Sequence, residues 1–306
     1  MKLLFSLFLI SNVLFAMSAK PKVYQDYHIV GFDTTKELIT KKMIVKALSK
    51  VGIKTINVQD MNTHFTKNNQ RSSFKSYHSL TYIHKDISKK LVQNNPHMGL
   101  FYPSSMAIYQ KKGDPFLWIS FLSSRTHSKI LKLTKREMLL AKLDQTILSA
   151  LLPLAKRPRF YQIGSSLQRE RKTLHHLSFT PKISTSALVQ NLFEGLSKLG
   201  FDKPTPVNIN KELATDEDRS TFKFYYGYLL SKPNLLYTLT ELHPEVGAFL
   251  PMSLVVYQKK GEKSVHIIYQ DVANIIDSSN ILQTENLRAL SKMQGALDTY
   301  IAKTVK

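Results

Sequence analysis

The sequence predicts an α+β protein made of two tandem copies of one small domain, each an antiparallel sheet with helices packed on one face. The chain matches itself when it is shifted by 148 positions, the separation of Leu48 and Leu196. Each copy also alternates strand-like and helical apolar patterns. Finally, a length of 306 residues suits two domains.

The duplication rests on four blocks that keep the same offset without a net gap. Residues 48–52 fall on 196–200, 71–77 on 219–225, 96–103 on 244–251 and 109–113 on 257–261. Chance would not hold one register over four blocks, so the two copies descend from one domain.

The repeat divides the chain into four segments. We expect copies over residues 20–155 and 173–306, an N-terminal segment 1–19 and a connection 156–172. Pro158, Gly164 and neighbouring serines make the connection a loop rather than a regular element. Its basic residues are expected to be solvated, and contact with an anionic surface is the alternative.

Each copy is expected to open with a strand, over 27–32 and 177–180, followed by a helix. Thr34 or Thr35, and Ser184, suit the helix N-cap, while Gly52 and Gly200 suit the C-terminal end. Apolar residues recur at helical spacing in both copies: Leu38, Ile39, Ile44, Val45, Leu48 and Val51, and Leu188, Leu192, Phe193, Leu196 and Leu199.

The middle of each copy combines a polar stretch with a strand and a short helix. Residues 59–73 and 208–221 read as a loop or a weak second helix. Strands are expected over 74–82 and 222–230, and helices over 85–93 and 234–242, which prolines at 96 and 244 terminate.

A hairpin and a long helix close each copy. The arms are expected at 105–110 and 116–121, and at 253–258 and 264–269, with Gly113 and Gly261 in left-handed turn positions. Both arms are apolar on nearly every residue, so a helix should cover one face. The closing helices carry two apolar stripes: Met138, Leu140, Leu143, Ile147, Leu151 and Leu154, and Leu287, Leu290, Met293, Leu297 and Ile301.

The turn before each hairpin carries a family resemblance. Residues 99–104 read Gly-Leu-Phe-Tyr-Pro-Ser and residues 247–252 read Gly-Ala-Phe-Leu-Pro-Met, and each is followed by an apolar strand ending in Tyr109 or Tyr257. Both copies thereby resemble the "domain of unknown function 302" family. The resemblance implies a compact fold similar to that of the TATA-binding protein, and it implies no activity.

This chain departs from the family at its cysteine positions. Ser104 and Met252 stand where the family often has Cys after the turn proline, and Ser231-Lys232-Pro233 is the nearest match to its Cys-Asn-Pro segment. Thiol-based or metal-based roles of relatives therefore do not carry over.

The N-terminus is typical of a signal peptide. Lys2 precedes an apolar run from Leu3 to Phe15, and small residues at Ala16 to Ala19 suit cleavage. A periplasmic or secreted protein is expected, with an uncleaved anchor as the alternative. The chain has no Cys, which excludes disulfides, a lipoprotein anchor and thiol catalysis.

The net charge of +21 favours anionic partners. Nucleic acid is an unfavoured partner for an exported protein, and membrane contact is expected only through the signal peptide or surface charge. A lysine-rich surface that serves solubility is the alternative.

The clearest candidate binding residues come from the second matching block. They are Arg71, Ser73, Lys75 and Tyr77, and their equivalents Arg219, Thr221, Lys223 and Tyr225. Side chains alternate along a strand, so each set is expected to share one face, where it would suit a carboxylate, phosphate or sulfate. A solvated strand face is the alternative.

No catalytic constellation accompanies these residues. Ser104 and Ser105 lie in a turn without a nucleophile elbow. His28 and His176 are expected to correspond between the copies, and the ten histidines form no zinc-binding motif. No cofactor or metal is expected. We expect a non-enzymatic binding module for an anionic or amphipathic small molecule or a protein partner. The alternatives are an enzyme with its site between the copies, or a binder of anionic lipid or polysaccharide.

Overall fold

A computed structural model describes residues 25–36, 38–69, 71–134, 137–168, 170–213 and 221–305. The expected signal peptide, residues 1–19, lies outside these ranges. Within them, no helix combines the length and apolar character needed to cross a membrane.

Each copy forms one antiparallel sheet. The first sheet has the order β2-β3-β4-β5-β1-β6 and the second has the order β7-β11-β10-β9-β8, so the same arrangement occurs twice with β6 added. The strands are β1 (Tyr27–Asp33), β2 (Lys54–Asp60), β3 (Phe74–Ile83), β4 (Ser104–Lys111), β5 (Phe116–Leu122), β6 (Arg159–Phe160), β7 (Leu174–Phe179), β8 (Val207–Asn208), β9 (Phe222–Leu230), β10 (Met252–Lys259) and β11 (Val265–Gln270).

The helices also occur in matching positions. In the first copy they are α1 (Lys41–Lys50), α2 (Met61–Asn69), α3 (Lys85–Asn94), the 3-10 helix η1 (Pro96–Phe101), α4 (Ser124–Ile130), α5 (Met138–Leu151) and the short η2 (Leu152–Leu154). In the second copy they are α6 (Thr185–Lys198), α7 (Ile209–Leu213), α8 (Pro233–Leu242), the 3-10 helix η4 (Pro244–Ala248), α9 (Ala273–Ser279) and α10 (Thr284–Thr304).

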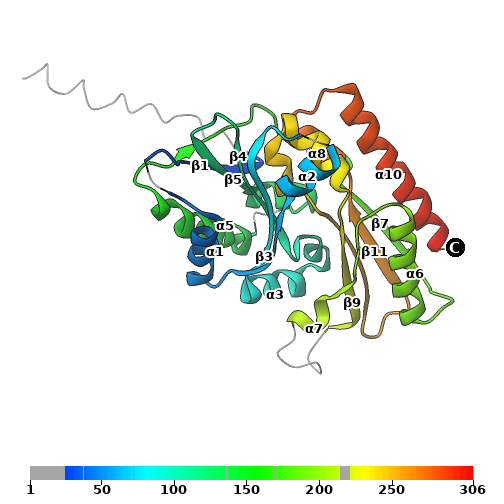
Figure 1. Cartoon of the computed structure of the whole chain (residues 1–306). Coiled ribbons are helices and arrows are strands. Elements are labelled where there is room, and N and C mark those ends of the chain that lie inside the picture. Colours follow the sequence, from blue (N-terminus) through cyan, green and yellow to red (C-terminus); the bar gives the residue numbers. More distant parts are fainter. Residues whose placement is uncertain are drawn as a thin grey trace, which may run out of the picture.

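The expected α+β class is confirmed, and the copies lie side by side (Figure 1). Helices α1 and α5 pack together on the outside of the first copy, and α6 and α10 do so on the second. The other face of each sheet meets the opposite copy: η4 contacts β4 and β5, and η1 contacts β10 and β11. The apolar hairpin arms are therefore covered on both faces, once by helices and once by the other copy.

The two copies share their hydrophobic cores. One core joins Tyr27, Phe65 and Tyr77 of the first copy to the interior of the second. The other joins Tyr225 and Tyr257 of the second copy to the interior of the first. The cores are shared because each sheet buries its second face against the other copy.

The first helix begins later than its sequence suggested. Thr40, whose hydroxyl accepts from the Met43 backbone N–H, caps α1, so neither Thr34 nor Thr35 does. Leu38 precedes the helix and is 79% exposed, although it was expected on the buried face. Ser184 caps α6 as expected, and Gly52 ends α1 with a φ of 80°.

The strand register also corrects the expected correspondence of two histidines. His28 pairs with Phe121 in the first sheet, and His175 pairs with Tyr269 in the second. Phe121 and Tyr269 are equivalent by the repeat, so His28 matches His175 rather than His176. The expected strand at 177–180 likewise begins three residues earlier, at Leu174.

The connection between the copies contains a short strand, contrary to expectation. Arg159 and Phe160 form β6 and pair with Gly31 and Val30 of β1. Leu167 is buried in the shared core. The connection therefore forms part of the fold. Leu167 is buried in the core that both copies share, and the backbone of Arg159 and Phe160 pairs with β1.

Candidate functional site

The interface between the copies includes two matching contacts, which we name after their 3-10 helices. In the η4 seam, η4 of the second copy packs on β4 and β5 of the first. In the η1 seam, η1 of the first copy packs on β10 and β11 of the second. The two contacts are reciprocal, so a local two-fold axis relates the copies.

One tyrosine closes each seam. The Tyr77 hydroxyl donates a 2.9 Å hydrogen bond to the Pro244 carbonyl, and the Tyr225 hydroxyl donates to the Pro96 carbonyl. A side chain at Gly247 would overlap the Tyr77 hydroxyl, and a side chain at Gly99 would overlap that of Tyr225. The repeated Tyr, Pro and Gly positions thus have a packing role in the inter-copy contact.

A buried ion pair joins both copies and the connection. Lys129 Nζ lies 2.7 Å from Asp26 Oδ1, and both side chains are almost fully buried. The Leu167 backbone N–H and the Ser278 hydroxyl also donate to this carboxylate, the latter over 2.8 Å. The Lys129 ammonium donates in turn to the Ser166 hydroxyl. Asp26 therefore ties the first copy, the connection and the second copy at one point.

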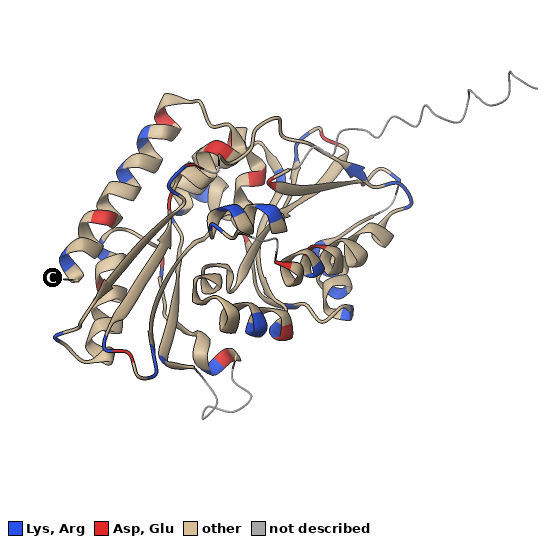
Figure 2. Ribbon diagram, turned by 180° about the vertical axis from the view of Figure 1, so that it is seen from behind, with Lys and Arg blue, Asp and Glu red and all other residues tan. Residues whose placement is uncertain are grey.

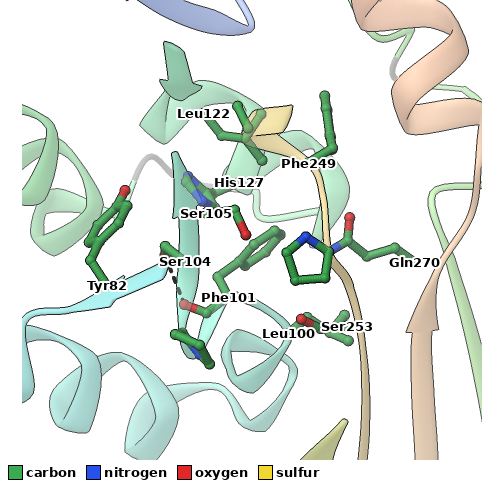
Figure 3. A pocket seen from close by; sticks show the side chains of 13 residues that line it. Tyr82, Leu100, Phe101, Ser104, Ser105, Leu122, His127, Phe249, Ser253 and Gln270 are labelled. Atoms are coloured by element: carbon green, nitrogen blue, oxygen red, sulfur yellow. Dashed lines mark hydrogen bonds between the residues drawn. The ribbon is translucent and has the colours of Figure 1, made fainter. Parts of the chain in front are cut away.

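A small pocket lies where the two copies meet (Figure 3). Five pairs of repeat-equivalent residues line it: Leu100 and Ala248, Phe101 and Phe249, Pro103 and Pro251, Ser105 and Ser253, and Leu122 and Gln270. Both prolines follow cis peptide bonds. Tyr82, Ser104 and His127 complete the lining. As it stands, the pocket leaves room for about one water molecule.

A second pocket adjoins the first inside the first copy. It lies among α3, η1, α4 and α5, and its walls include the apolar side chains of Leu91, Val92, Met98, Leu140 and Leu143. Phe101, Ser104 and His127 line both pockets. A pocket of mixed lining between the copies and an apolar pocket within one copy thus meet at these three residues.

His127 presents a hydrogen-bond acceptor at this meeting point. Its Nδ1 lies 2.9 Å from the Ser123 carbonyl oxygen, which can only accept, so Nδ1 carries the proton. Burial lowers the pKa of His127 to about 4, so the ring is neutral near pH 7. Nε2 is then an unprotonated acceptor, and among the described residues the hydrogen bond of this ring is the one made by Nδ1. The Phe101 ring meets the imidazole edge-to-face, with 4.3 Å between the ring centroids.

The candidate binding residues do not share one strand face as expected. The pairing of β3 with β4 shifts between Phe74 and Ser76, which leaves Lys75 as a bulge. Phe74 and Tyr77 therefore point the same way, and their ring centroids lie 4.9 Å apart in the core. The same shift in β9 leaves Lys223 unpaired in the ladder.

The remaining candidates lie at the solvent-facing ends of β3 and β9. Arg71, Lys75, Thr221 and Lys223 are exposed, and Ser73 is half-buried. Arg219 lies outside the described residues. Lys and Arg occur along many elements of both copies (Figure 2). Tyr77 and Tyr225 belong to the seams, and anion binding by the exposed residues stays a prediction.

The residues that line the two pockets were not identified from the sequence. His127 lies on α4, an element that the sequence did not predict. Leu91 and Leu143 lie on expected helices to which the sequence assigns no binding role. The repeated Gly-x-Phe-x-Pro turn was a usable signal, because Phe101 and Phe249 both reach the pocket. Among the residues that the structure describes, no group of three or more His, Asp or Glu is placed to hold a metal ion.

Comparison with known proteins matches this architecture to one family. The family model "Domain of unknown function DUF302" matches residues 34–151 and again residues 177–300. The chain belongs to the DUF302 family. Its two matches coincide with the two copies, which confirms a tandem DUF302 duplicate.

A solved DUF302 structure is similar to part of the chain. It is the uncharacterized conserved protein DUF302 from Bacillus stearothermophilus, with 12% identity and a TM-score of 0.38, and the match covers 43% of this chain and 100% of that one. No curated protein matches the sequence. In this DUF302 protein, Ser104 lines both pockets. Its hydroxyl donates a 2.8 Å hydrogen bond to the Phe101 carbonyl.

Proposed function

We propose that this DUF302 protein is a non-enzymatic binding protein whose two copies act as one unit, and that its ligand is a small amphipathic molecule. The supporting observation is that a pocket of mixed polar and apolar lining and an apolar pocket meet at Phe101, Ser104 and His127. Ligand sites combine apolar walls with a few placed polar groups, and they often form between domains. Because little free space exists beforehand, binding requires the Phe101 ring to move.

The polar groups favour a neutral ligand that donates a hydrogen bond. His127 offers the lone pair of Nε2 and is uncharged near pH 7, so it attracts a hydroxyl or amide N–H and gives no charge to an anion. Asp144, which accepts from His28 and from the Ser124 backbone N–H, adds negative charge behind His127. The apolar walls suit a short hydrocarbon chain. A medium-chain alcohol is therefore a better fit than the matching carboxylate.

The test compares hexanol with hexanoate, two probes of equal chain length and different polar ends. Chemical-shift titration of the mature protein should show saturable binding of hexanol at amides near Phe101 and His127, and much weaker binding of hexanoate. Phe101→Ala enlarges the joined space and should tighten hexanol binding. His127→Leu removes the acceptor and should weaken it, whereas His64→Leu on α2 should not. Binding of neither probe to the wild type or to Phe101→Ala would reject the proposal.

A second candidate is an anionic ligand at the basic strand ends. In both copies the bulge turns a lysine, Lys75 or Lys223, toward solvent beside the hairpin turn. The Lys112 backbone N–H donates to the Ser73 carbonyl, and that of Lys260 donates to Thr221, so both ends are built alike. A phosphate titration that leaves the amides of residues 71–77 and 221–225 unmoved would reject this candidate.

We also propose that the protein is exported, on the strength of the Lys2 to Ala19 segment. The expected location is the periplasm or the exterior. Intact mass of the protein isolated from its natural source would show a chain that begins near residues 17–20 if the segment is removed. A mass that retains residues 1–19 would support the anchored alternative.

A further inference from the structure

We propose that three histidines make the η1 seam sensitive to acid, and that their protonation releases η1 and opens the pocket beside it. The residues are His97 on η1, His176 on β7 and His266 on β11. His97 belongs to the first copy, and His176 and His266 belong to the second copy. The release of η1 is independent of the proposed function, whereas its consequence for ligand binding rests on that function.

The three imidazole rings lie next to one another across the seam. The ring centroids of His97 and His176 are 5.2 Å apart, and those of His176 and His266 are 5.3 Å apart. Nε2 of His176 lies 3.0 Å from Nδ1 of His266. Two facing nitrogens at this distance share one proton, so the contact is favourable only while at least one of the two rings is neutral.

The charged groups around the cluster act against protonation of His97. Burial, His176, His266 and Lys259 of β10 together lower the pKa of His97 to about 4. Burial and His266 lower the pKa of His176. Glu262 supplies the opposing charge from the β10–β11 turn: its Oε2 lies 3.2 Å from Nε2 of His266, and its Oε1 lies 3.6 Å from the Lys259 ammonium.

Two further elements face the cluster. Tyr257 of β10 stacks on His266, with 4.9 Å between the ring centroids. Helix α3 packs on η1 and carries Lys85, Asp86, Lys89 and Lys90. The charges that act on the pKa of His97 are nevertheless those of the second copy. Protonation therefore places like charges on opposite sides of the seam.

The same short helix connects the cluster to the pocket. η1 spans six residues, beginning after Asn95, and it carries both His97 and Phe101. Phe101 and Leu100 line the pocket between the copies, and Phe101 also lines the apolar pocket. Loss of the η1 contact with β10 and β11 would free the ring that occupies the junction of the two pockets. Acid should therefore open the site.

The other seam provides an internal control. In the η4 seam, Glu245 is equivalent to His97 and Trp118 is equivalent to His266. The ring N–H of Trp118 donates a 2.8 Å hydrogen bond to the Asp114 carboxylate. The Glu245 carboxylate lies 3.6 Å from His243, which raises the pKa of that histidine. Acid should therefore leave η4 in place while it releases η1.

Amide hydrogen exchange of the full mature chain tests the release of η1. Protection of residues 98–102, corrected for the intrinsic rate, should fall on the order of tenfold between about pH 7 and about pH 5, while residues 246–250 keep theirs. His97→Gln and His176→Gln should each reduce this loss. Equal protection of residues 98–102 at both pH values, or an undiminished loss in both variants, would overturn the proposal.

Hexanol titration at the same two pH values tests the consequence for the site. Faster exchange of residues 98–102 together with hexanol binding that changes with pH supports both proposals. Faster exchange without hexanol binding at either pH rejects the binding function and leaves the acid-sensitive seam standing. Hexanol binding with unchanged exchange retains the binding function and rejects the acid-sensitive seam.

Discussion

The η4 seam and the η1 seam share one packing scheme and differ in their charges. In both, a tyrosine hydroxyl from β3 or β9 donates to the first proline carbonyl of the opposite 3-10 helix. The η4 seam buries Glu245 among tyrosines and beside His243. The η1 seam places His97 among two histidines and Lys259. Duplication therefore kept the shape of the contact while the electrostatics diverged.

A matching pair of hairpin residues shows the same divergence. Trp118 of β5 donates to Asp114, and the equivalent His266 of β11 lies 3.2 Å from Glu262. Both arrangements tie a ring nitrogen to an acidic residue of the hairpin turn. The η1 seam therefore carries an imidazole at the position where the η4 seam carries an indole.

The largest expected effect is the loss of the buried Asp26 carboxylate, which ties the two copies and their connection together. Asp26→Ala leaves the Lys129 ammonium buried without its partner, which should lower the free energy of unfolding by about 3–5 kcal/mol. Urea denaturation measures it. Lys36→Ala, which removes an 80% exposed partner of Asp33, should change stability by less than about 1 kcal/mol. Similar effects of the two substitutions would show that Asp26 is not the common tie.

The next effect comes from filling the space that each tyrosine hydroxyl occupies. Gly99→Val and Gly247→Val should each destabilise the protein by about 1–3 kcal/mol, because the added side chain displaces Tyr225 or Tyr77. Gly164→Val, in open space within the connection, is the matched control. Thermal unfolding compares all three. A cost at only one of the two seams would show that they are not equivalent.

Removal of the hydroxyls should have a smaller effect. Tyr77→Phe and Tyr225→Phe each leave a proline carbonyl without its donor, at a cost of about 1 kcal/mol. Because the two sites lie in different seams, the double variant should lose the sum of the single losses. A large deviation from additivity in urea denaturation would indicate that the seams open together.

The pH response should differ in sign between the seams. The folded pKa of His97 lies below its unfolded value, so its contribution to stability is present above about pH 6.5 and is lost as the pH falls toward about 4. The folded pKa of His243 is raised, so its contribution is present at low pH and is lost as the pH rises through the folded pKa. His97→Gln should thus flatten the acid side of the stability profile, and His243→Gln should lower stability in acid. Both changes should stay below about 1 kcal/mol because solvent screens these half-buried groups. Equal slopes in the two variants would contradict the comparison.

The smallest effect on stability is expected at the bulged lysines. Lys75→Ala and Lys223→Ala should each change the free energy of unfolding by less than about 0.5 kcal/mol, because both side chains are exposed. Any phosphate binding at these ends should weaken in both variants. Unchanged phosphate affinity in the double variant would end the assignment of these lysines to an anion site.

Much of each copy followed from local sequence patterns. The strand at 74–82, the helix at 85–93 and both hairpins lie within one or two residues of their expected bounds, because alternation, prolines and turn glycines act over short distances. The edge strand β2 and the short helix α4 were missed. β2 shows only a short alternation of apolar and polar residues and is mostly exposed. α4 has only 7 residues, which is too short for an apolar face to repeat along it.

The candidate site depends on strand pairing and inter-copy contacts that local sequence patterns do not predict. Strict alternation placed Lys75 and Tyr77 on one face, but the bulge at Lys75 turns Tyr77 inward, and a bulge depends on pairing with β4. The inter-copy pocket depends on η1 of one copy and η4 of the other, so neither half of the sequence describes it alone.

The sequence by itself determined the duplication, the α+β class, the turn chemistry and the basic, cysteine-free surface, because these depend on residue identity and near-neighbour spacing. Tertiary structure alone decided that the copies share two cores, that Asp26 ties them together and that His127 meets two pockets. Contacts between residues more than a hundred positions apart carry no local signature, since they depend on how two sheets bury their second faces.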